Sequence, residues 1–291
     1  VEESAEHHFL TFLEKIKRDS GGWFGFHFAV SQKLQHAEII SRPEHIKGKL
    51  HRLQKDSEDL VRELAQGVKD DSSAMIYRFS DSDVILLVRP GKDAERDRLQ
   101  AFFKNMEHKF GKELCAQSNL AKDIYSYQKL ADERLLSASR VKAYEAMADT
   151  NRVQSIPLRR ERRDDPVILI VEDDRFTASY AASILNKDYD IVLAKSGEEA
   201  ITLYVEHAPD MVFLDIHLPG LDGIDTLRGL RKIDPQGFIF MLSVDTVKTN
   251  IVAANKEGAA GFLKKPFGKE RLMAAVEKSP FVKNLKNKSG S

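Results

Sequence analysis

The residues with the greatest chemical potential follow short apolar runs in the second half of the chain. An acid, a hydroxyl or an ammonium group comes directly after four of these runs, at Glu172, Asp173, Asp215, Ser243 and Lys265. The carboxyl ends of parallel strands meet at one edge of a sheet, and ligands bind beyond that edge. If the runs are strands of one parallel sheet, these five side chains share a single site.

Three carboxylates at one edge of a sheet need a counter-charge. Glu172, Asp173 and Asp215 would repel one another strongly in a partly dry cleft. A divalent cation removes that repulsion, and carboxylate oxygens, a backbone carbonyl and retained waters suit Mg²⁺, which prefers octahedral oxygen coordination. The sequence therefore predicts a magnesium site.

The same residues indicate phosphoryl-transfer chemistry. With a metal ion present, the Asp215 carboxylate can act as a nucleophile toward a phosphoryl group. Lys265 and Ser243 can hold the oxygens of the incoming group, and the metal and the lysine neutralise charge that develops on the transferring phosphate.

The spacing of apolar residues predicts the elements that position these side chains. Runs 167–171, 191–194, 211–214, 238–242 and 261–264 are typical of strands, and amphipathic segments with helical spacing separate them. Continuous β-branched runs favour strands that are buried on both faces. Five strands alternating with five helices predict an α/β fold with a doubly wound parallel sheet.

Composition excludes several classes of protein. The 291 residues contain 45 Lys and Arg and 45 Asp and Glu, so the net charge is zero, and Cys115 is the single cysteine. A disulfide-stapled scaffold is excluded, and a protein coated in positive charge for non-specific nucleic-acid binding is disfavoured. No apolar run approaches the roughly 20 residues of a membrane-spanning helix, and the first residues do not resemble a signal peptide. We expect a cytoplasmic protein with no membrane association and no direct DNA binding.

Composition also divides the chain. Dense charge and Pro157 in 151–165, followed directly by Pro166, predict an exposed, solvated linker. We expect an N-terminal domain over 1–150, the parallel-sheet domain over 166–280 and a C-terminal tail over 281–291.

The first half predicts an α+β domain. Expected elements are a helix over 3–17, a strand over 23–30, a helix over 43–66, a hairpin of 75–79 with 84–88, and a helix over 94–110. This order matches most of a ferredoxin-like βαββαβ unit. A long helix over 120–147 is expected to lead to the linker. Its apolar register allows a dimeric coiled coil and hence a homodimer, although packing on its own domain is favoured.

The motifs of the second half resemble the receiver domain of two-component response regulators, close to the chemotaxis response regulator. The similar segments are 171–174, 213–215, 218–223, 242–243 and 263–267. The resemblance implies that Asp215 is the phosphoacceptor and that a sensor histidine kinase or a phosphotransfer protein is the donor. It also implies Mg²⁺ ligands from the side chains of Glu172, Asp173 and Asp215 and from the backbone carbonyl of His217.

The resemblance also assigns a switch. Ser243 stands at the hydroxyl position and Phe262 at the aromatic position, where the ring lacks the phenolic hydroxyl of a tyrosine. The Lys265–Pro266 peptide is expected to be cis. His217 and Asp245 are expected to flank the path of attacking water. A backbone role alone is favoured for His217, and the alternative hypothesis is that its side chain changes the autodephosphorylation rate.

The hairpin of the first half resembles that of diguanylate cyclases (GGDEF domains), over residues 20–115. Arg78 and Phe79 precede Ser80 and Asp81, which replace both glycines of the cyclase motif. Glycine lets the backbone approach the substrate closely, and strand 26–31 lacks the metal-binding aspartate of the family. We therefore expect a related fold without cyclase activity. The alternative is an unrelated ferredoxin-like domain with a tight turn.

The predicted function is a two-component response regulator, in which phosphorylation of Asp215 controls the binding of a downstream protein by the non-catalytic first domain. We expect no enzymatic activity beyond the phosphoryl transfer and dephosphorylation of the receiver itself. The alternatives are a receiver-regulated nucleotide cyclase-like enzyme, a c-di-GMP-related binding module and an aspartate-nucleophile phosphatase. The last class needs a second aspartate two positions after the nucleophile, where His217 stands.

Overall fold

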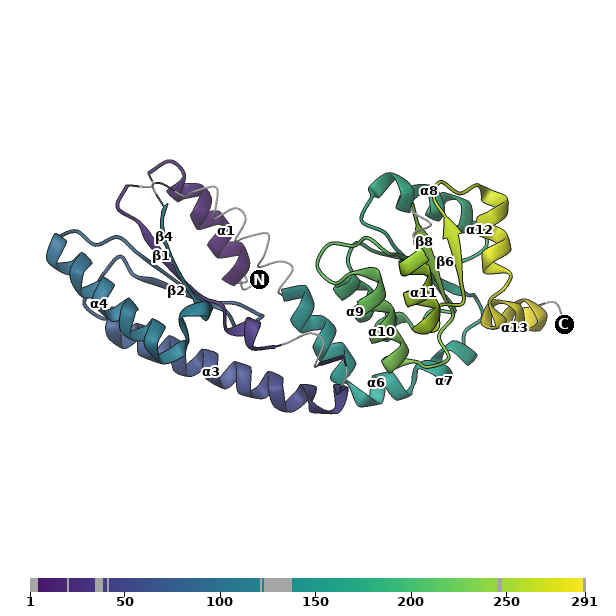
Figure 1. The fold of residues 1–291 in the computed structure, drawn as a ribbon, viewed down its shortest axis with the longest axis horizontal. Coiled ribbons are helices and arrows are strands. Elements are labelled where there is room, and N and C mark those ends of the chain that lie inside the picture. The colour runs from purple at the N-terminus through teal and green to yellow at the C-terminus, as the bar shows by residue number, and fades with distance from the viewer. Residues whose placement is uncertain are drawn as a thin grey trace. The chain divides into compact units, whose positions relative to one another are not determined.

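The computed structural model describes residues 5–19, 21–34, 39–40, 42–120, 122, 138–244 and 248–289 (Figure 1). The chain divides into two compact units, a first unit of Val1–Ile39 with Lys47–Val141 and a second unit of Ile40–Ile46 with Lys142–Ser291. No helix among the described residues is both long and apolar enough to cross a membrane.

The second unit contains a sheet of five parallel strands in the order β6-β5-β7-β8-β9. The strands are β5 (Val167–Val171), β6 (Asp190–Ala194), β7 (Met211–Asp215), β8 (Ile239–Ser243) and β9 (Gly261–Lys264). Because β6 and β7 lie on opposite sides of β5, the winding of the sheet reverses there, and the carboxyl ends of β5 and β7 are adjacent. The predicted doubly wound parallel sheet is confirmed.

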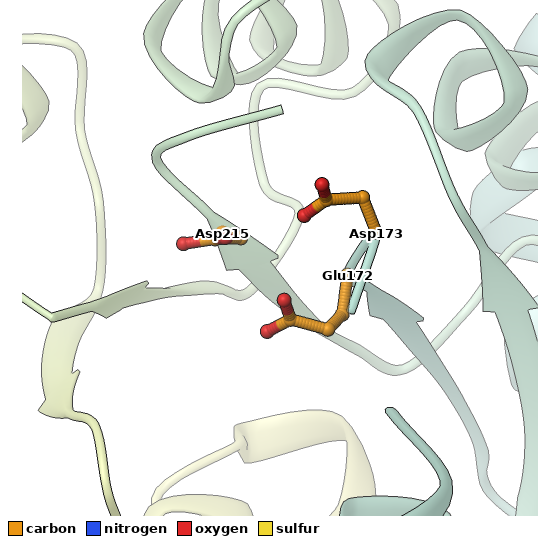
Figure 2. Close-up of side chains that lie close together, drawn as sticks. All are labelled: Glu172, Asp173 and Asp215. Carbon is orange, nitrogen blue, oxygen red and sulfur yellow. The ribbon is translucent and has the colours of Figure 1, made fainter. Parts of the chain in front are cut away.

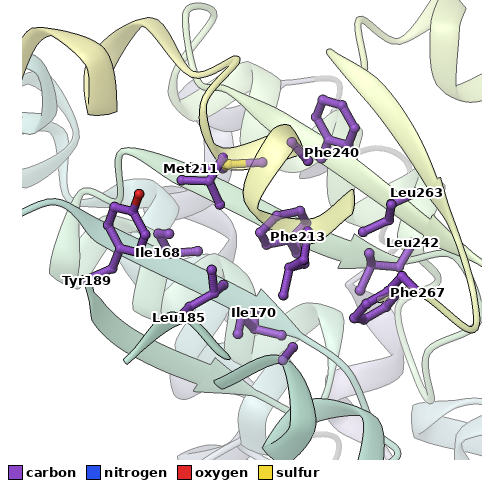
Figure 3. Packing of buried hydrophobic residues seen from close by; sticks show 14 of the residues in the cluster. Ile168, Ile170, Leu185, Tyr189, Met211, Phe213, Phe240, Leu242, Leu263 and Phe267 are labelled. Atoms are coloured by element: carbon purple, nitrogen blue, oxygen red, sulfur yellow. The ribbon is translucent and has the colours of Figure 1, made fainter. Parts of the chain in front are cut away.

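Helices cover both faces of this sheet. They are α8 (Arg175–Leu185), α9 (Gly197–His207), α10 (Gly223–Ile233), α11 (Lys248–Lys256) and α12 (Lys269–Val276). The pairs α8 with α12 and α9 with α10 are in contact. Alternate strand residues point to opposite faces, and those that face α8 and α12 form a buried cluster around Phe213 and Ile170 (Figure 3). Burying each such side chain stabilises the fold by roughly 1.5–3 kcal/mol.

Local signals set the helix boundaries near the sheet edge. Asp174 caps α8 by accepting a hydrogen bond from the Thr177 N–H at 2.8 Å, and Asp222 caps α10 by accepting one from the Asp225 N–H at 2.8 Å. Such caps satisfy N–H groups that a helix cannot pair internally.

The expected solvated linker is wrong in its central stretch. Residues 151–165 contain most of α6 (Thr150–Gln154) and all of α7 (Ile156–Glu161), where Ile156 is fully buried and Arg160 is 4 % exposed. Arg160 Nη2 donates to Asp234 Oδ2 at 2.7 Å. The prediction failed because the composition of a basic segment does not reveal a partner 74 residues away.

Arg159 and Arg163, in the same stretch, donate hydrogen bonds to the C-terminal end of α9. Arg159 donates to the carbonyl oxygens of Val205 and Glu206 at 2.6 and 2.7 Å, and Arg163 donates to that of His207. The last carbonyls of a helix lack partners within the helix and carry partial negative charge. The charge run therefore fixes α7 to the second unit.

The expected C-terminal tail is also wrong in part, because residues 280–289 form α13 (Pro280–Ser289). Val282 and Leu285 are buried, and the Ser279 hydroxyl donates to the Asp210 carbonyl at 2.8 Å. Two apolar residues three positions apart give the helix its buried face.

The first unit is α+β, as predicted. Its antiparallel sheet has the order β2-β3-β1-β4, with β1 (Phe24–Phe28), β2 (Met75–Arg78), β3 (Val84–Val88) and β4 (Cys115–Asn119). The helices are α1 (Ala5–Ile16), α3 (Ile46–Gly67) and α4 (Asp93–Phe110), with short 3₁₀ turns at Val30–Lys33, Pro43–His45 and Lys112–Leu114. The sequence β1-α3-β2-β3-α4-β4 is the ferredoxin-like βαββαβ order. Strand β4 was not predicted from the sequence, because this edge strand is mostly polar.

Helix α1 packs on the hairpin formed by β2 and β3. The centroid of the Phe9 ring lies 5.2 Å from the ring centroids of both Tyr77 and Phe79. Most of the expected helix 120–147, namely residues 121 and 123–137, lies outside the described residues, whereas 138–148 is helical.

Candidate metal centre

Three carboxylates meet at the carboxyl ends of β5 and β7. Glu172 and Asp173 follow β5, and Asp215 ends β7, in a register that pairs Val171 with Leu214. One carboxylate oxygen from each of the three acids lies within 4.8 Å of the others (Figure 2). Adjacent parallel strands that end together produce this convergence, as expected from the sequence.

Lys265 brings a positive charge to the two buried acids. Glu172 is 2 % exposed and Asp215 4 % exposed, whereas Asp173 is open to solvent. Lys265 Nζ lies 2.9 Å from Asp215 Oδ2 and also forms an ion pair with Glu172. Lys265 follows β9, two strands from β7, so the reach of its long side chain brings it to the carboxylates.

The electrostatics of the cluster favour a further positive charge. Burial raises the pKa of Glu172, and the negative charge of Asp215 raises it further, although the hydrogen bond and charge of Lys265 act against both effects. By contrast, hydrogen bonds from Thr177 lower the pKa of the neighbouring Asp174 carboxyl. One lysine pairs with two of the three acids, so the cluster holds more negative than positive charge.

The donor set fits Mg²⁺. Asp215 Oδ1 is buried and has no hydrogen-bond partner among the described residues. A buried oxygen without a partner is costly and points to an ion or a ligand. The carboxylate oxygens of Glu172, Asp173 and Asp215 are the hard ligands that this cation prefers.

The remaining predicted site residues lie on neighbouring strands or in the segment after β7. Ser243 ends β8 beside β7, is buried, and accepts a backbone hydrogen bond from the Lys265 N–H at 2.8 Å. Phe262 lies half-buried in β9, and His217 is exposed in the segment after β7. The Lys265–Pro266 peptide is cis, as predicted. Asp245 lies outside the described residues.

The segment after Asp215 is packed closely against its surroundings. A Cβ atom on Gly223 would lie 2.1 Å from the Asp215 carbonyl oxygen, so only glycine fits there. Glu198 of α9, which sequence reasoning did not single out, is 1 % exposed and contacts this segment. Nothing in the local sequence signals this burial, because an acid in the first turn of a helix is ordinarily exposed, as Glu199 is.

The hairpin of the first unit has its own buried acid. Asp83 Oδ2 lies 2.9 Å from His27 Nε2, and Asp83 Oδ1 accepts the Ser31 N–H at 2.6 Å. At the turn, the Ser80 N–H and hydroxyl both donate to Glu6 Oε1, at 2.8 and 2.6 Å. Within the described part of this unit, no three His, Cys, Asp or Glu side chains lie close enough to share an ion.

The parallel-sheet unit is similar to known proteins. Residues 168–277 match the sequence model of the response regulator receiver domain. The chain is 37 % identical over 114 residues to the chemotaxis protein CheY of Bacillus subtilis (strain 168). This match covers 38 % of the chain and 95 % of that relative. It is 35 % identical over 113 residues to the chemotaxis protein CheY of Thermotoga maritima. This match covers 38 % of the chain and 94 % of that relative.

A similar solved structure is the non-phosphorylated HemR receiver domain from Leptospira biflexa. It is 30 % identical, with a TM-score of 0.37, and the match covers 39 % of this chain and 93 % of that one.

Proposed function

The chain belongs to the response regulator receiver domain family through residues 168–277, and from this premise we propose that Asp215 is the residue that accepts the phosphoryl group. The observation that carries the proposal is the state of its carboxylate. Asp215 Oδ2 lies 2.9 Å from Lys265 Nζ, whereas Asp215 Oδ1 is buried and has no hydrogen-bond partner among the described residues. Lys265 therefore holds one oxygen, and the other is left for a ligand.

The transfer is a displacement at phosphorus. An oxygen of the Asp215 carboxylate attacks phosphorus, a P–O bond forms, and the P–N bond to the donor histidine breaks. The donor imidazole keeps the electron pair of that bond and takes up a proton. Asp215 is well suited as a nucleophile because its carboxylate is fixed by Lys265.

The surrounding residues stabilise the transferred group. Glu172, Asp173 and Asp215, with the backbone carbonyl of His217, would hold Mg²⁺. When bound, this ion supplies positive charge to the phosphoryl oxygens. Lys265 adds a second positive charge on the other side of the acceptor.

Ser243 and Phe262 are proposed to report the modification. Phosphorylation adds about two negative charges, which favours movement of the Ser243 hydroxyl toward the phosphoryl group. Phe262 lies on the neighbouring strand β9 and is half-buried, and its ring is proposed to move inward when the Ser243 hydroxyl moves. A small local change is then converted into a different surface around β9.

A receiver implies a sensor histidine kinase or a phosphotransfer protein as its partner. We propose that the donor contacts α8, which begins at the metal centre and exposes two aromatic side chains. Phe176 is 86 % exposed and Tyr180 is 48 % exposed. Large exposed aromatics close to a reactive group are typical of a docking surface.

The first unit is proposed to bind a downstream protein and to have no catalytic activity. Both oxygens of Asp83 are engaged, by His27 and by the Ser31 N–H. The Ser80 turn is held by Glu6 of α1 rather than left open for a substrate. A nucleotide turnover assay with GTP tests this, and product formation would refute it.

Acetyl phosphate, a small phosphodonor, tests the acceptor directly. With Mg²⁺ present, the full chain should gain the mass of one phosphoryl group, and it should gain none after removal of the metal with EDTA. Asp215→Asn should remain unmodified under both conditions. The matched control is Asp190→Asn, an exposed acid on β6 away from the site, which should behave like the unmodified chain. Equal labelling of Asp215→Asn and the unmodified chain would overturn the proposal.

A further inference from the structure

Glu198 is a buried carboxylate that touches the segment following Asp215 but belongs to a different element. It is the second residue of α9 and is 1 % exposed. Its Oε2 accepts a hydrogen bond from the Leu221 N–H at 3.2 Å. Acidic side chains are almost never fully buried unless they have a partner. The Leu221 N–H is one partner of Glu198.

The segment that Glu198 contacts, residues 216–222, is here called the acceptor loop. It leads from the end of β7 to the start of α10. At its base, the Gly223 N–H donates to the Ile216 carbonyl at 2.9 Å, and the Ile216 N–H donates to the Leu242 carbonyl at 3.2 Å. The base is thus fixed to the sheet, and the bond to Glu198 holds the outer half.

Gly220 shows how closely the acceptor loop lies on the Glu198 carboxylate. A Cβ atom at Gly220 would lie 2.8 Å from Oε1 and 2.9 Å from Oε2 of Glu198. Gly220 also has a φ of 77°, which L side chains rarely adopt. On the helix side, a Cβ atom at Gly197 would lie 2.6 Å from the Leu221 carbonyl oxygen. Two glycines therefore let backbone and carboxylate meet.

We propose that Glu198 is a positioning residue for the metal centre. Its carboxylate fixes the acceptor loop, and the loop in turn fixes the backbone carbonyl of His217. The inference rests on the proposed function, in which that carbonyl is a ligand of Mg²⁺. This cation requires near-ideal octahedral geometry, so a displaced carbonyl is a lost ligand.

Calorimetric titration of the full chain with Mg²⁺ tests the proposal without a phosphoryl donor. Glu198→Ala removes the acceptor of the Leu221 N–H, and loss of such an outer contact weakens metal binding by about 10- to 100-fold. Glu198→Gln keeps an oxygen that can accept the same hydrogen bond, so it should bind Mg²⁺ like the unmodified chain. A role in folding alone would lower stability without this difference in affinity.

Glu199→Ala is the matched control. Glu199 is the next residue of the same helix turn, is exposed, and accepts the Lys195 N–H at 2.7 Å rather than contacting the acceptor loop. This variant should leave the affinity for Mg²⁺ unchanged.

Gly220→Ala supplies a second, independent variant that keeps the carboxylate but displaces it. Added to the unmodified chain, the methyl group should weaken Mg²⁺ binding about as much as Glu198→Ala does. Added to Glu198→Ala, it meets no carboxylate, so only the strain of the positive φ remains and binding should weaken less. Residues in contact show such non-additivity, whereas independent sites do not. If Glu198→Ala fails to fold, Gly220→Ala should still bind Mg²⁺ more weakly than Glu198→Gln does. Equal Mg²⁺ affinities of these two variants would then contradict the proposal.

A readout without metal separates this inference from the proposed function. Hydrogen exchange at the Leu221 amide should be faster in Glu198→Ala than in the unmodified chain. Unchanged exchange and unchanged Mg²⁺ affinity in a folded Glu198→Ala would overturn the inference, as would a Glu198→Gln chain that binds as weakly as Glu198→Ala. A chain that takes up no Mg²⁺ would overturn the proposed metal centre, and the exchange rates would still decide whether Glu198 holds the loop.

Discussion

The two ends of the parallel sheet both bury charged side chains, yet they use them differently. At the carboxyl end, one ammonium group, that of Lys265, faces several acids, and Asp215 Oδ1 has no hydrogen-bond partner among the described residues. At the opposite end, Arg160 donates to Asp234 at 2.7 Å and to the Tyr204 hydroxyl at 3.2 Å. The Tyr204 hydroxyl also donates to Asp234 at 2.8 Å.

The difference separates a structural site from a reactive one. Charges that are matched and fully hydrogen-bonded hold elements together, as α7 is held here. Charges that are left in excess raise the free energy of the folded chain until a ligand neutralises them. Burial is therefore similar for Asp234 and Asp215, and the bonding of their carboxylate oxygens distinguishes them.

The largest expected effect comes from removing the guanidinium of the buried Arg160–Asp234 pair. Arg160→Ala leaves the buried Asp234 carboxylate without its charge partner, and such losses cost about 3–5 kcal/mol of unfolding free energy. Urea denaturation measures the change. Acceptance of a phosphoryl group by the fraction that remains folded should be unaffected.

Arg152→Ala is the control for this change. Its side chain is 50 % exposed and lies 4.0 Å from Glu206, so its loss should stay within about 0.5 kcal/mol. Equal effects of the two variants would show that the buried pair is not what holds α7.

The next largest effect concerns the backbone behind Asp215. Gly223→Ala places a methyl group against the Asp215 carbonyl and the Ile216 Cα, at positions only 2.1 and 2.7 Å away. Because backbone atoms must move, the unfolding free energy should fall by about 1–3 kcal/mol. Mg²⁺ affinity should fall as well, because the Asp215 carboxylate moves together with the Asp215 backbone carbonyl.

Gly48→Ala in α3 provides the opposite case. A Cβ atom there meets nothing within 4 Å, so the substitution should stabilise the chain by about 0.5–1 kcal/mol. A destabilised Gly48→Ala chain together with an unaffected Gly223→Ala chain would contradict the packing described for both positions.

A smaller effect is expected in the pH dependence of stability. Burial acts to raise the pKa of Asp234, but the positive charge of Arg160 and hydrogen bonds from Arg160 and Tyr204 outweigh it and hold the pKa below its ordinary value. The stabilisation is then complete above the unfolded-state pKa of about 4 and is lost as the pH falls through the lower folded-state pKa.

Asp234→Asn lacks this ionisation. The difference in unfolding free energy between the unmodified chain and this variant should therefore be constant above about pH 5 and should shrink below about pH 4. Urea denaturation across this range measures it. A difference that grows toward low pH would mean that folding raises the pKa of Asp234 rather than lowering it.

The smallest expected effect on stability comes from Phe176→Ala. This side chain is 86 % exposed, so the unfolding free energy should change by no more than about 0.5 kcal/mol. Transfer from a histidine-phosphorylated phosphotransfer domain should slow, whereas labelling by acetyl phosphate should not. Val252→Ala on α11, 64 % exposed, is the matched control, and equal slowing in both variants would contradict docking on α8.

Sequence reasoning predicted the parts that local pattern determines. Apolar runs indicated the five parallel strands, and the acids that follow them were expected to meet because carboxyl ends of adjacent strands meet. The convergence of Glu172, Asp173 and Asp215 within 4.8 Å agrees with that expectation. In the first unit, the order of strands and helices predicted the α+β class in the same way.

Sequence reasoning failed where a partner far away in the chain changes the environment of a residue. Arg160 has the sequence surroundings of a solvated linker, and only its contact with Asp234 explains its burial. Glu198 has the appearance of a surface residue of a helix until the acceptor loop covers it. Composition records the type of a side chain but not the partner that buries it.

Reduction of the phosphorylated chain with borohydride, followed by peptide sequencing, tests the central claim most directly, because borohydride converts an aspartyl phosphate to homoserine. We predict homoserine in place of Asp215 after incubation with acetyl phosphate and Mg²⁺, and unmodified aspartate at 173 and 174. Homoserine at either of those two positions, with Asp215 intact, would contradict the assignment of Asp215 as the acceptor.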